Sequence, residues 1–202
     1  MIDYIKDVDL FDHVREYNAT LIGTNICYFM RNGIQRQVSI NYPYVYDANM
    51  KTKYMDNKKM GTILECKEDG EPTFILCFIN NRLNTRPDIK PDYLSYESLE
   101  QCLKVINILY KGQHLASPLL GVSRFDGNGD KERIKEIFER CITDIDLTIY
   151  DYEQKSRSEM FLEKHKKELE IKKKDWFLYQ KIVKERAARE KEIKKRNGRA
   201  KY

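Results

Sequence analysis

Hydrophobic residues in the first three quarters of the chain follow two kinds of pattern, one typical of helices and one typical of strands. Residues 95–110 carry apolar side chains at helical spacing, whereas short apolar stretches bounded by polar or turn-forming residues predict strands. Strands that alternate with helices predict an α/β fold of three layers, α/β/α, around a mixed central sheet. The other helices are expected to start near Gly33, after Pro43 and at Asp130, and the strands are expected at 2–5, 19–23, 62–66, 73–78, from Leu115, and at 147–150, with a hairpin turn at 67–72.

Three loops are candidate binding segments, because ligands of such sheets bind outside the carboxyl ends of the strands. They are residues 24–33, 79–86 and 121–130. The last holds Gly121, Gly127 and Gly129 between a strand and a helix. Glycines let backbone N–H groups approach an anion, and the start of a helix presents N–H groups without partners. Both a phosphate-binding loop and an ordinary strand-to-helix connection fit this pattern.

Charge divides the chain into two parts. Residues 153–202 hold 18 Lys and Arg against 9 Asp and Glu, a net charge of +9, while residues 1–152 hold 19 against 23, a net charge of −4. The sequence therefore predicts a mildly acidic globular domain over 1–152 and a basic tail over 153–202.

The tail is expected to form one long helix, since 155–196 contains no proline or glycine and is rich in good helix formers. One interpretation is contact with the phosphates of DNA or RNA; the other is a solvated helix that packs through its Trp176 region. In the first case binding falls steeply with salt and is lost in a chain that ends at Tyr152. The residues expected to contact nucleic acid include Arg186, Arg189, Lys194, Lys195 and Arg196.

Five scattered cysteines without a CxxC pair favour reduced thiols and a cytoplasmic location. The three histidines lie far apart in the sequence, so no metal site is expected, and no cofactor is implied. No signal peptide is visible, and no apolar stretch is long enough for a membrane span, so no membrane partner is expected.

Four segments in this order resemble a macrodomain, the module that binds ADP-ribose, and the resemblance runs from about residue 2 to residue 151. Val8–Phe11 is similar to the family's entry motif, with valine in place of glycine. Thr24–Ile34 resembles the first phosphate loop, in which Asn25, Met30, Gly33 and Ile34 match and Tyr28 and Arg31 replace glycines. The other two segments are Phe78–Arg82 and Ser117–Gly121.

The resemblance implies roles for individual residues. Asp9 would accept a hydrogen bond from the adenine amino group, and Gly121, Val122 and Ser123 would belong to the second phosphate loop. Asp9 could instead only cap the turn before Phe11, and Asn25 could hold its own loop rather than touch a ribose. Tyr28 would either narrow the first loop or stack on the ligand.

The stretch Phe78–Arg82 is closest to the branch of the family that removes ADP-ribose from DNA bases or acidic side chains. That branch uses a lysine at the position of Asn81, and a carboxamide cannot replace it as a nucleophile. Asp126 could still act as a general base on water, with Arg82 holding the diphosphate.

Three functions follow from this comparison. The first is an ADP-ribose-binding protein that hydrolyses the bond to ADP-ribosylated nucleic acid or protein. The second is a non-catalytic binder of ADP-ribose or a related signalling nucleotide, and the third is a nucleic-acid-binding protein with a vestigial pocket. Divergent loops on a compact body with a basic helix also lead to the hypothesis of a viral protein.

Overall fold

The computed structural model describes residues 1–80, 94–123 and 127–151. Contacts within the chain divide it into Met1–Glu153 and Gln154–Tyr202, and the description below concerns the first of these units. The expected C-terminal helix, with Arg186, Arg189, Lys194, Lys195 and Arg196, lies outside the described residues. So do Asn81, Arg82 and Asp126.

A mixed sheet of six strands forms the centre of the unit, as the sequence predicts. Its order is β1-β6-β5-β2-β4-β3, and every neighbouring pair is parallel except β3 with β4. The strands are β1 (Ile2–Lys6), β2 (Ala19–Asn25), β3 (Ile63–Cys66), β4 (Phe74–Asn80), β5 (His114–Pro118) and β6 (Asp146–Asp151).

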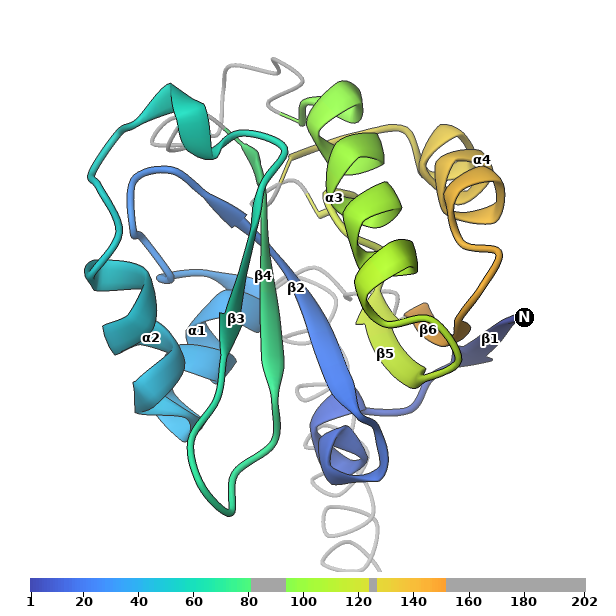
Figure 1. The fold of residues 1–202 in the computed structure, drawn as a ribbon, viewed down its shortest axis with the longest axis horizontal. Helices are drawn as coiled ribbons and strands as arrows, with labels where there is room; N and C mark the ends of the chain where they lie inside the picture. Colours follow the sequence, from blue (N-terminus) through green and yellow to red (C-terminus); the bar gives the residue numbers. More distant parts are fainter. Residues whose placement is uncertain (81–93, 124–126, 152–202) are drawn as a thin grey trace, which may run out of the picture. The chain divides into compact units, whose positions relative to one another are not determined.

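Helices cover both faces of the sheet (Figure 1). Helices α1 (Gly33–Asn41) and α2 (Pro43–Met50) lie on one side, and α3 (Tyr96–Leu109) and α4 (Lys131–Cys141) lie on the other. Three 3-10 turns complete the described elements: η1 (Leu10–Asp12), η2 (Val14–Glu16) and η3 (Asn57–Lys59). The expectation of three layers, α/β/α, is confirmed.

Alternating side chains of the central strands fill two cores. On β2, Leu21 belongs to the core under α3 and α4, whereas its neighbour Ile22 belongs to the core under α1 and α2. Ile75 and Leu76 divide in the same way on β4. Because successive side chains of a strand point to opposite faces, a strand buried on both sides becomes a continuous apolar run. This is why 19–23 and 73–78 could be recognised in the sequence.

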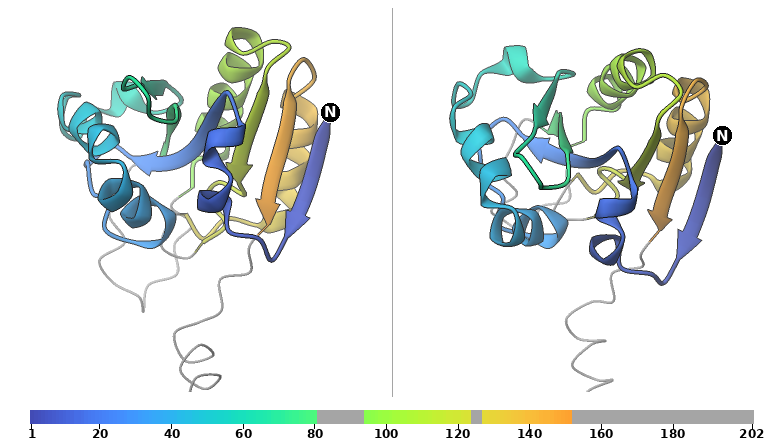
Figure 2. Two further views of the ribbon diagram at one scale, coloured as in Figure 1. Left: turned by 90° about the horizontal axis from the view of Figure 1, so that it is seen from below. Right: turned by 60° about the horizontal axis from the view of Figure 1, so that its bottom comes forward.

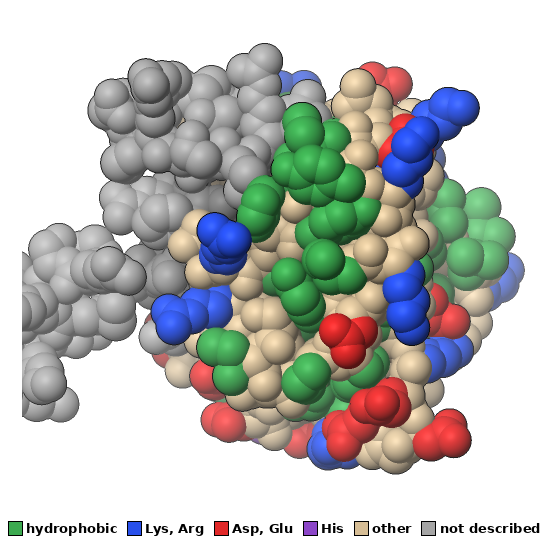
Figure 3. Space-filling view, turned by 90° about the vertical axis from the view of Figure 1, so that its left-hand side faces the viewer, with side chains coloured by type: hydrophobic (Ala, Val, Ile, Leu, Met, Phe, Trp, Pro, Cys, Tyr) green, Lys and Arg blue, Asp and Glu red, His purple; other side chains and the backbone are tan. Residues whose placement is uncertain are grey.

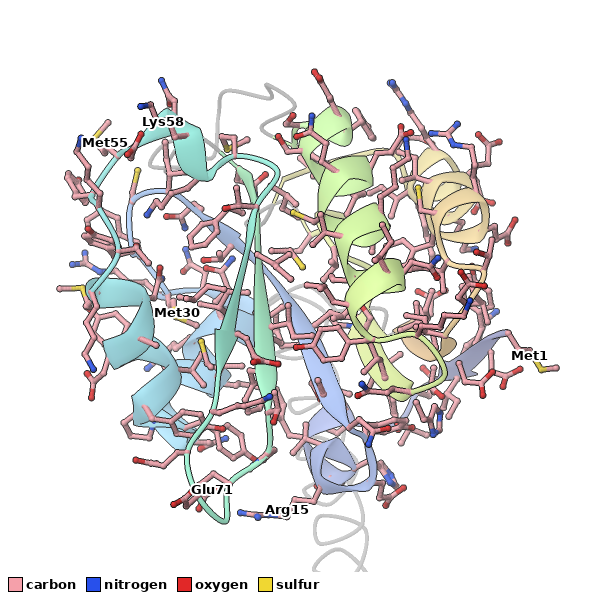
Figure 4. The ribbon with its side chains drawn as sticks, viewed as in Figure 1. Met1, Arg15, Met30, Met55, Lys58 and Glu71 are labelled. Carbon is pink, nitrogen blue, oxygen red and sulfur yellow. The ribbon has the colours of Figure 1, made fainter. Side chains whose placement is uncertain are left out.

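The predicted hairpin between β3 and β4 is confirmed by their antiparallel pairing, from Ile63 opposite Cys77 to Cys66 opposite Phe74. Its turn is held to the start of the chain by Arg15, whose guanidinium donates to the Gly70 carbonyl at 2.9 Å and to the Glu71 carboxylate at 2.7 Å. Arg15 and Glu71 face each other at this end of the sheet (Figure 4).

Element ends differ slightly from the expectations. Strand β2 continues two residues beyond Gly23, to Asn25, because the ladder with β4 also includes Thr24 and Asn25. The helix expected after Pro43 begins at Pro43 itself and ends at Met50. Helix α4 begins at Lys131, since Asp130 caps it by accepting from the Arg133 N–H at 2.8 Å.

The five cysteines are free and buried, in agreement with the expectation of reduced thiols. In the part of the chain that the structure describes, no helix has both the length and the apolar character needed to cross a bilayer.

Candidate functional site

Strands β2 and β5 separate toward their carboxyl ends. They pair only at Ala19 with Leu115 and Thr20 with Ala116, although β2 runs on to Asn25 and β5 to Pro118. Figure 2 shows β2 turning away from β5 beyond this point. The chain after β2 enters α1 on one face, and the chain after β5 enters α4 on the other. Such a divergence is where open α/β sheets bind ligands.

Several carbonyl groups of the loop after β2, residues 26–32, accept hydrogen bonds from the protein. The Ile26 carbonyl accepts from the Met55 N–H at 2.9 Å, the Phe29 carbonyl from the Asn25 side-chain amide at 3.0 Å, and the Met30 carbonyl from the Ser39 hydroxyl at 3.2 Å. These three bonds attach the loop to the protein through its carbonyl groups.

Backbone N–H groups of the same loop remain without hydrogen-bond acceptors. Within the described part of the chain, the N–H groups of Phe29, Met30, Arg31 and Asn32 have no acceptor. Asn32 precedes α1 without capping it through its side chain, so the N–H groups of Gly33 and Ile34 add to this set. Unpaired backbone donors at a helix start form a binding place for an anion.

Gly33 lies at the junction of this loop and α1. Its φ is +50°, and a Cβ built on it would have nothing within 4 Å. The left-handed backbone favours glycine, and the open space above it leaves the neighbouring N–H groups accessible. Of the matching residues, Gly33 therefore has the geometry that the phosphate-loop hypothesis requires.

Asn25 is buried at the end of β2, where the β2–β4 register is irregular. Its side-chain oxygen accepts from the Cys27 N–H at 2.9 Å, and its side-chain nitrogen donates to the Phe29 carbonyl at 3.0 Å. Both ends of the amide thus hold the loop 26–32, which is the structural alternative that the sequence left open for this residue.

Tyr28, which replaces a glycine of the family motif, keeps a glycine-like backbone with φ +64°. Its hydroxyl donates to the Thr52 carbonyl, and its ring lies 5.2 Å from that of Tyr54. The Lys59 amine sits 4.7 Å from the centre of the Tyr28 ring and 4.8 Å from that of Phe78. The ring of Tyr28 therefore joins the loop to the segment between α2 and β3.

Lys59 is the unexpected charged residue of this region. Its amine donates to the Thr52 hydroxyl at 3.0 Å, and burial lowers its pKa below the ordinary value for lysine, an effect that Cys27 and Asp56 oppose. Burial likewise raises the pKa of the Cys27 thiol. The two aromatic faces stabilise the charged amine through cation–π contacts, so Lys59 supplies a cation behind the loop 26–32.

The glycines after β5 have a packing role. Gly121 has φ +81°, and a Cβ on it would lie 2.6 Å from Leu94 Cδ1; a Cβ on Gly129 would lie 2.5 Å from Leu94 Cδ2. The Gly129 N–H donates to the Gly121 carbonyl at 2.9 Å and closes the loop on itself. The missing Cβ atoms make room for Leu94 inside the protein.

Asp9 follows β1 and is exposed. Its Oδ1 accepts from the Phe11 N–H at 3.0 Å and caps η1, which is the capping role considered for it. Its other carboxylate oxygen accepts no hydrogen bond from the described residues, so it can accept one from a ligand.

The remaining candidates divide by burial. Met30 is buried and Ile34 is half-buried, and both pack in the core under α1 and α2. Val122 packs against the opposite core, and Ser123, half-buried, accepts from the Asn128 N–H through its carbonyl at 3.0 Å. Among the described residues no group of three His, Cys, Asp or Glu side chains could hold a metal ion.

No family model and no curated protein matches the sequence. The macrodomain of Thermus aquaticus DarG matches the structure with a TM-score of 0.57 at 15% identity, over 75% of this chain and 98% of that chain. The macrodomain of Mycobacterium tuberculosis DarG matches with a TM-score of 0.53 at 22% identity, over 74% and 97%.

A third match is Thermosipho africanus DarTG, determined in complex with ADP-ribose, with a TM-score of 0.56 at 17% identity, over 77% of this chain and 43% of that chain. The sheet, its two helical layers and the separation of β2 from β5 place this chain among the three-layer α/β proteins. Its fold is that of a macrodomain.

Proposed function

We propose that the chain binds ADP-ribose, either free or attached to a macromolecule, where β2 and β5 separate. The observation that carries this proposal is the set of unpaired N–H groups from Phe29 to Asn32, followed by the open glycine at the start of α1. A diphosphate is the anion that such donors suit. The shared fold with a DarTG protein determined in complex with ADP-ribose supports the choice of this ligand.

The proposal gives each candidate residue a role. The diphosphate lies against the N–H groups before Gly33, and Asn25 acts by holding the loop that presents them. The free carboxylate oxygen of Asp9 accepts from the adenine amino group. Gly121, Val122 and Ser123 form the opposite side of the ligand, while Met30 and Ile34 support the first loop from the core.

Calorimetry with the full chain tests the proposal. Titration with ADP-ribose is expected to give a saturating heat of binding, with adenosine weaker because it lacks the diphosphate. Absence of any heat with ADP-ribose would overturn the proposal.

Hydrolysis is a second step of the proposal, in which Asp126 activates water and Arg82 holds the diphosphate, with Asn81 in place of the family's lysine. Incubation with ADP-ribosylated DNA and with ADP-ribosylated protein, followed by detection of released ADP-ribose, separates an enzyme from a binder. Binding without release would remove the hydrolytic step and leave the binding function.

Two substitutions of Asp9 separate its cap from its contact with the ligand. Asp9→Ser keeps a side-chain oxygen for the Phe11 N–H, whereas Asp9→Ala removes it and is expected to cost about 1 kcal/mol of stability. Both are expected to weaken ADP-ribose binding about tenfold or more, since each removes a charged acceptor. If calorimetry shows that Asp9→Ser binds as the wild type does, Asp9 serves only as a cap.

A further inference from the structure

An apolar face lies on α1, α2 and the segment that follows α2. Its members are large hydrophobic side chains left exposed on consecutive elements: Ile40, Tyr46, Met50, Tyr54 and Met55. Ile40 is 62% exposed and Met55 is 57% exposed, so these side chains gain little from the fold of the chain itself. Figure 3 shows a band of hydrophobic side chains on this side of the molecule. We call the five exposed residues the α1–α2 face.

Basic side chains flank the upper and middle part of the band, and acidic side chains lie at its lower end (Figure 3). Residues 28–60 contain six Lys and Arg against two Asp, a net charge of +4, whereas the rest of residues 1–152 carries −8. Arg31, Arg36, Lys51 and Lys58 make no ion pair within the described residues. A cluster of unpaired cations on an otherwise acidic domain attracts an anionic partner.

A cavity of about 250 Å³ opens beside the band. It is lined by Phe29, Met30, Arg31, Ser39 and Tyr46. The Arg31 guanidinium lies 4.6 Å from the centre of the Phe29 ring and so presents its charge at the rim. A cavity lined by two aromatic rings, a methionine, a serine and an arginine can receive one hydrophobic side chain that has an acidic neighbour, which is the form of an interface anchor.

We propose that the α1–α2 face binds an acidic amphipathic segment of a partner protein. Tyrosine, methionine and arginine are enriched in protein interfaces, and the rim of an interface is polar. Methionine adapts its shape to a partner's apolar side chains. Nucleic-acid bases stack on aromatic rings, and three of the five members of this face, Ile40, Met50 and Met55, have no ring. The composition of the α1–α2 face therefore fits a peptide better than single-stranded nucleic acid.

The test uses the full chain and a synthetic helical peptide with leucines on one face and glutamates on the other. Backbone chemical shifts in NMR locate its binding site, and fluorescence anisotropy measures its affinity. Shifts are expected within residues 28–60, with affinity that falls as salt is raised. The double variant Ile40→Gln/Met55→Gln is expected to bind about tenfold more weakly. The matched control Ile108→Gln/Leu109→Gln, on exposed positions of α3, is expected to bind within twofold of the wild type.

Several outcomes would overturn the proposal. They are equal binding of a peptide with lysines in place of the glutamates, shifts confined to other residues, and equal loss in both double variants. Shifts of residues 28–60 by a thymidine oligonucleotide but not by the peptide would assign the face to nucleic acid. Sedimentation that reveals dimers sensitive to Ile40→Gln/Met55→Gln would assign it to a second copy. The titrations contain no ADP-ribose, and Ile40 and Met55 lie outside the loop proposed to bind it, so failure of one proposal leaves the other standing.

Discussion

Replacement of Gly121 by alanine is expected to lower the free energy of unfolding by about 2–5 kcal/mol. Two effects add at this position. The backbone has φ +81°, which disfavours a side chain, and the new Cβ would lie 2.6 Å from Leu94 Cδ1. Leu94 is buried, and its Cδ2 also lies 2.5 Å from where a Cβ on Gly129 would be, so its side chain is packed against two of the glycines. Denaturant unfolding of the full chain measures the change.

Gly70→Ala provides the control for backbone strain. Gly70 has φ +78°, but a Cβ there meets nothing within 4 Å, so only the conformational cost of about 1 kcal/mol is expected. The difference between the two variants is the cost of overlap with Leu94. Equal losses of stability would show that Gly121 is needed for its backbone conformation alone, and the packing interpretation of this loop would be wrong.

Gly33→Ala is expected to weaken ADP-ribose binding about tenfold or more, with little further effect on the fold than Gly70→Ala has. The new methyl group meets no protein atom within 4 Å, so it occupies the space in which we expect the diphosphate to approach the N–H groups. Loss of even one such charged hydrogen bond has this magnitude. Calorimetry gives the affinity, and thermal unfolding gives the stability.

Gly70→Ala is again the control variant. Gly70 has a positive φ and open space at its Cβ position, as Gly33 has, but it lies in the β3–β4 hairpin. It is expected to bind ADP-ribose as the wild type does. Unchanged affinity of Gly33→Ala would locate the ligand elsewhere and would contradict the proposed use of this helix start.

The elements that the sequence predicted well are those whose signal is local. Helical spacing alone was enough to predict that Leu99, Cys102 and Leu103 share one face of a helix. That face is the buried side of α3. The hairpin between 62–66 and 73–78 needed only two apolar strands and a polar turn. Asp130 could be recognised as a helix start because a cap acts within three residues of itself.

The parts of the site that the sequence could not supply depend on distant contacts. Lys59 is 31 residues from Tyr28 in the sequence, yet its amine lies over that ring. Gly121 was expected to make room for a phosphate, but the neighbour of its missing Cβ is Leu94. Neither contact can be predicted from spacing along the chain, because each depends on how β2, β4 and β5 lie in the sheet.

The two-residue pairing of β2 with β5 also determines how a ligand would affect the whole molecule. Backbone bonds join these strands only at their amino ends, and beyond them the two sides of the sheet are joined by buried side chains such as Leu21 and Leu120. A ligand that touches both the loop 26–32 and the loop after β5 would act as a clamp across this seam. Its binding energy would then resist separation of the two halves, and saturation would raise the unfolding temperature of the entire domain.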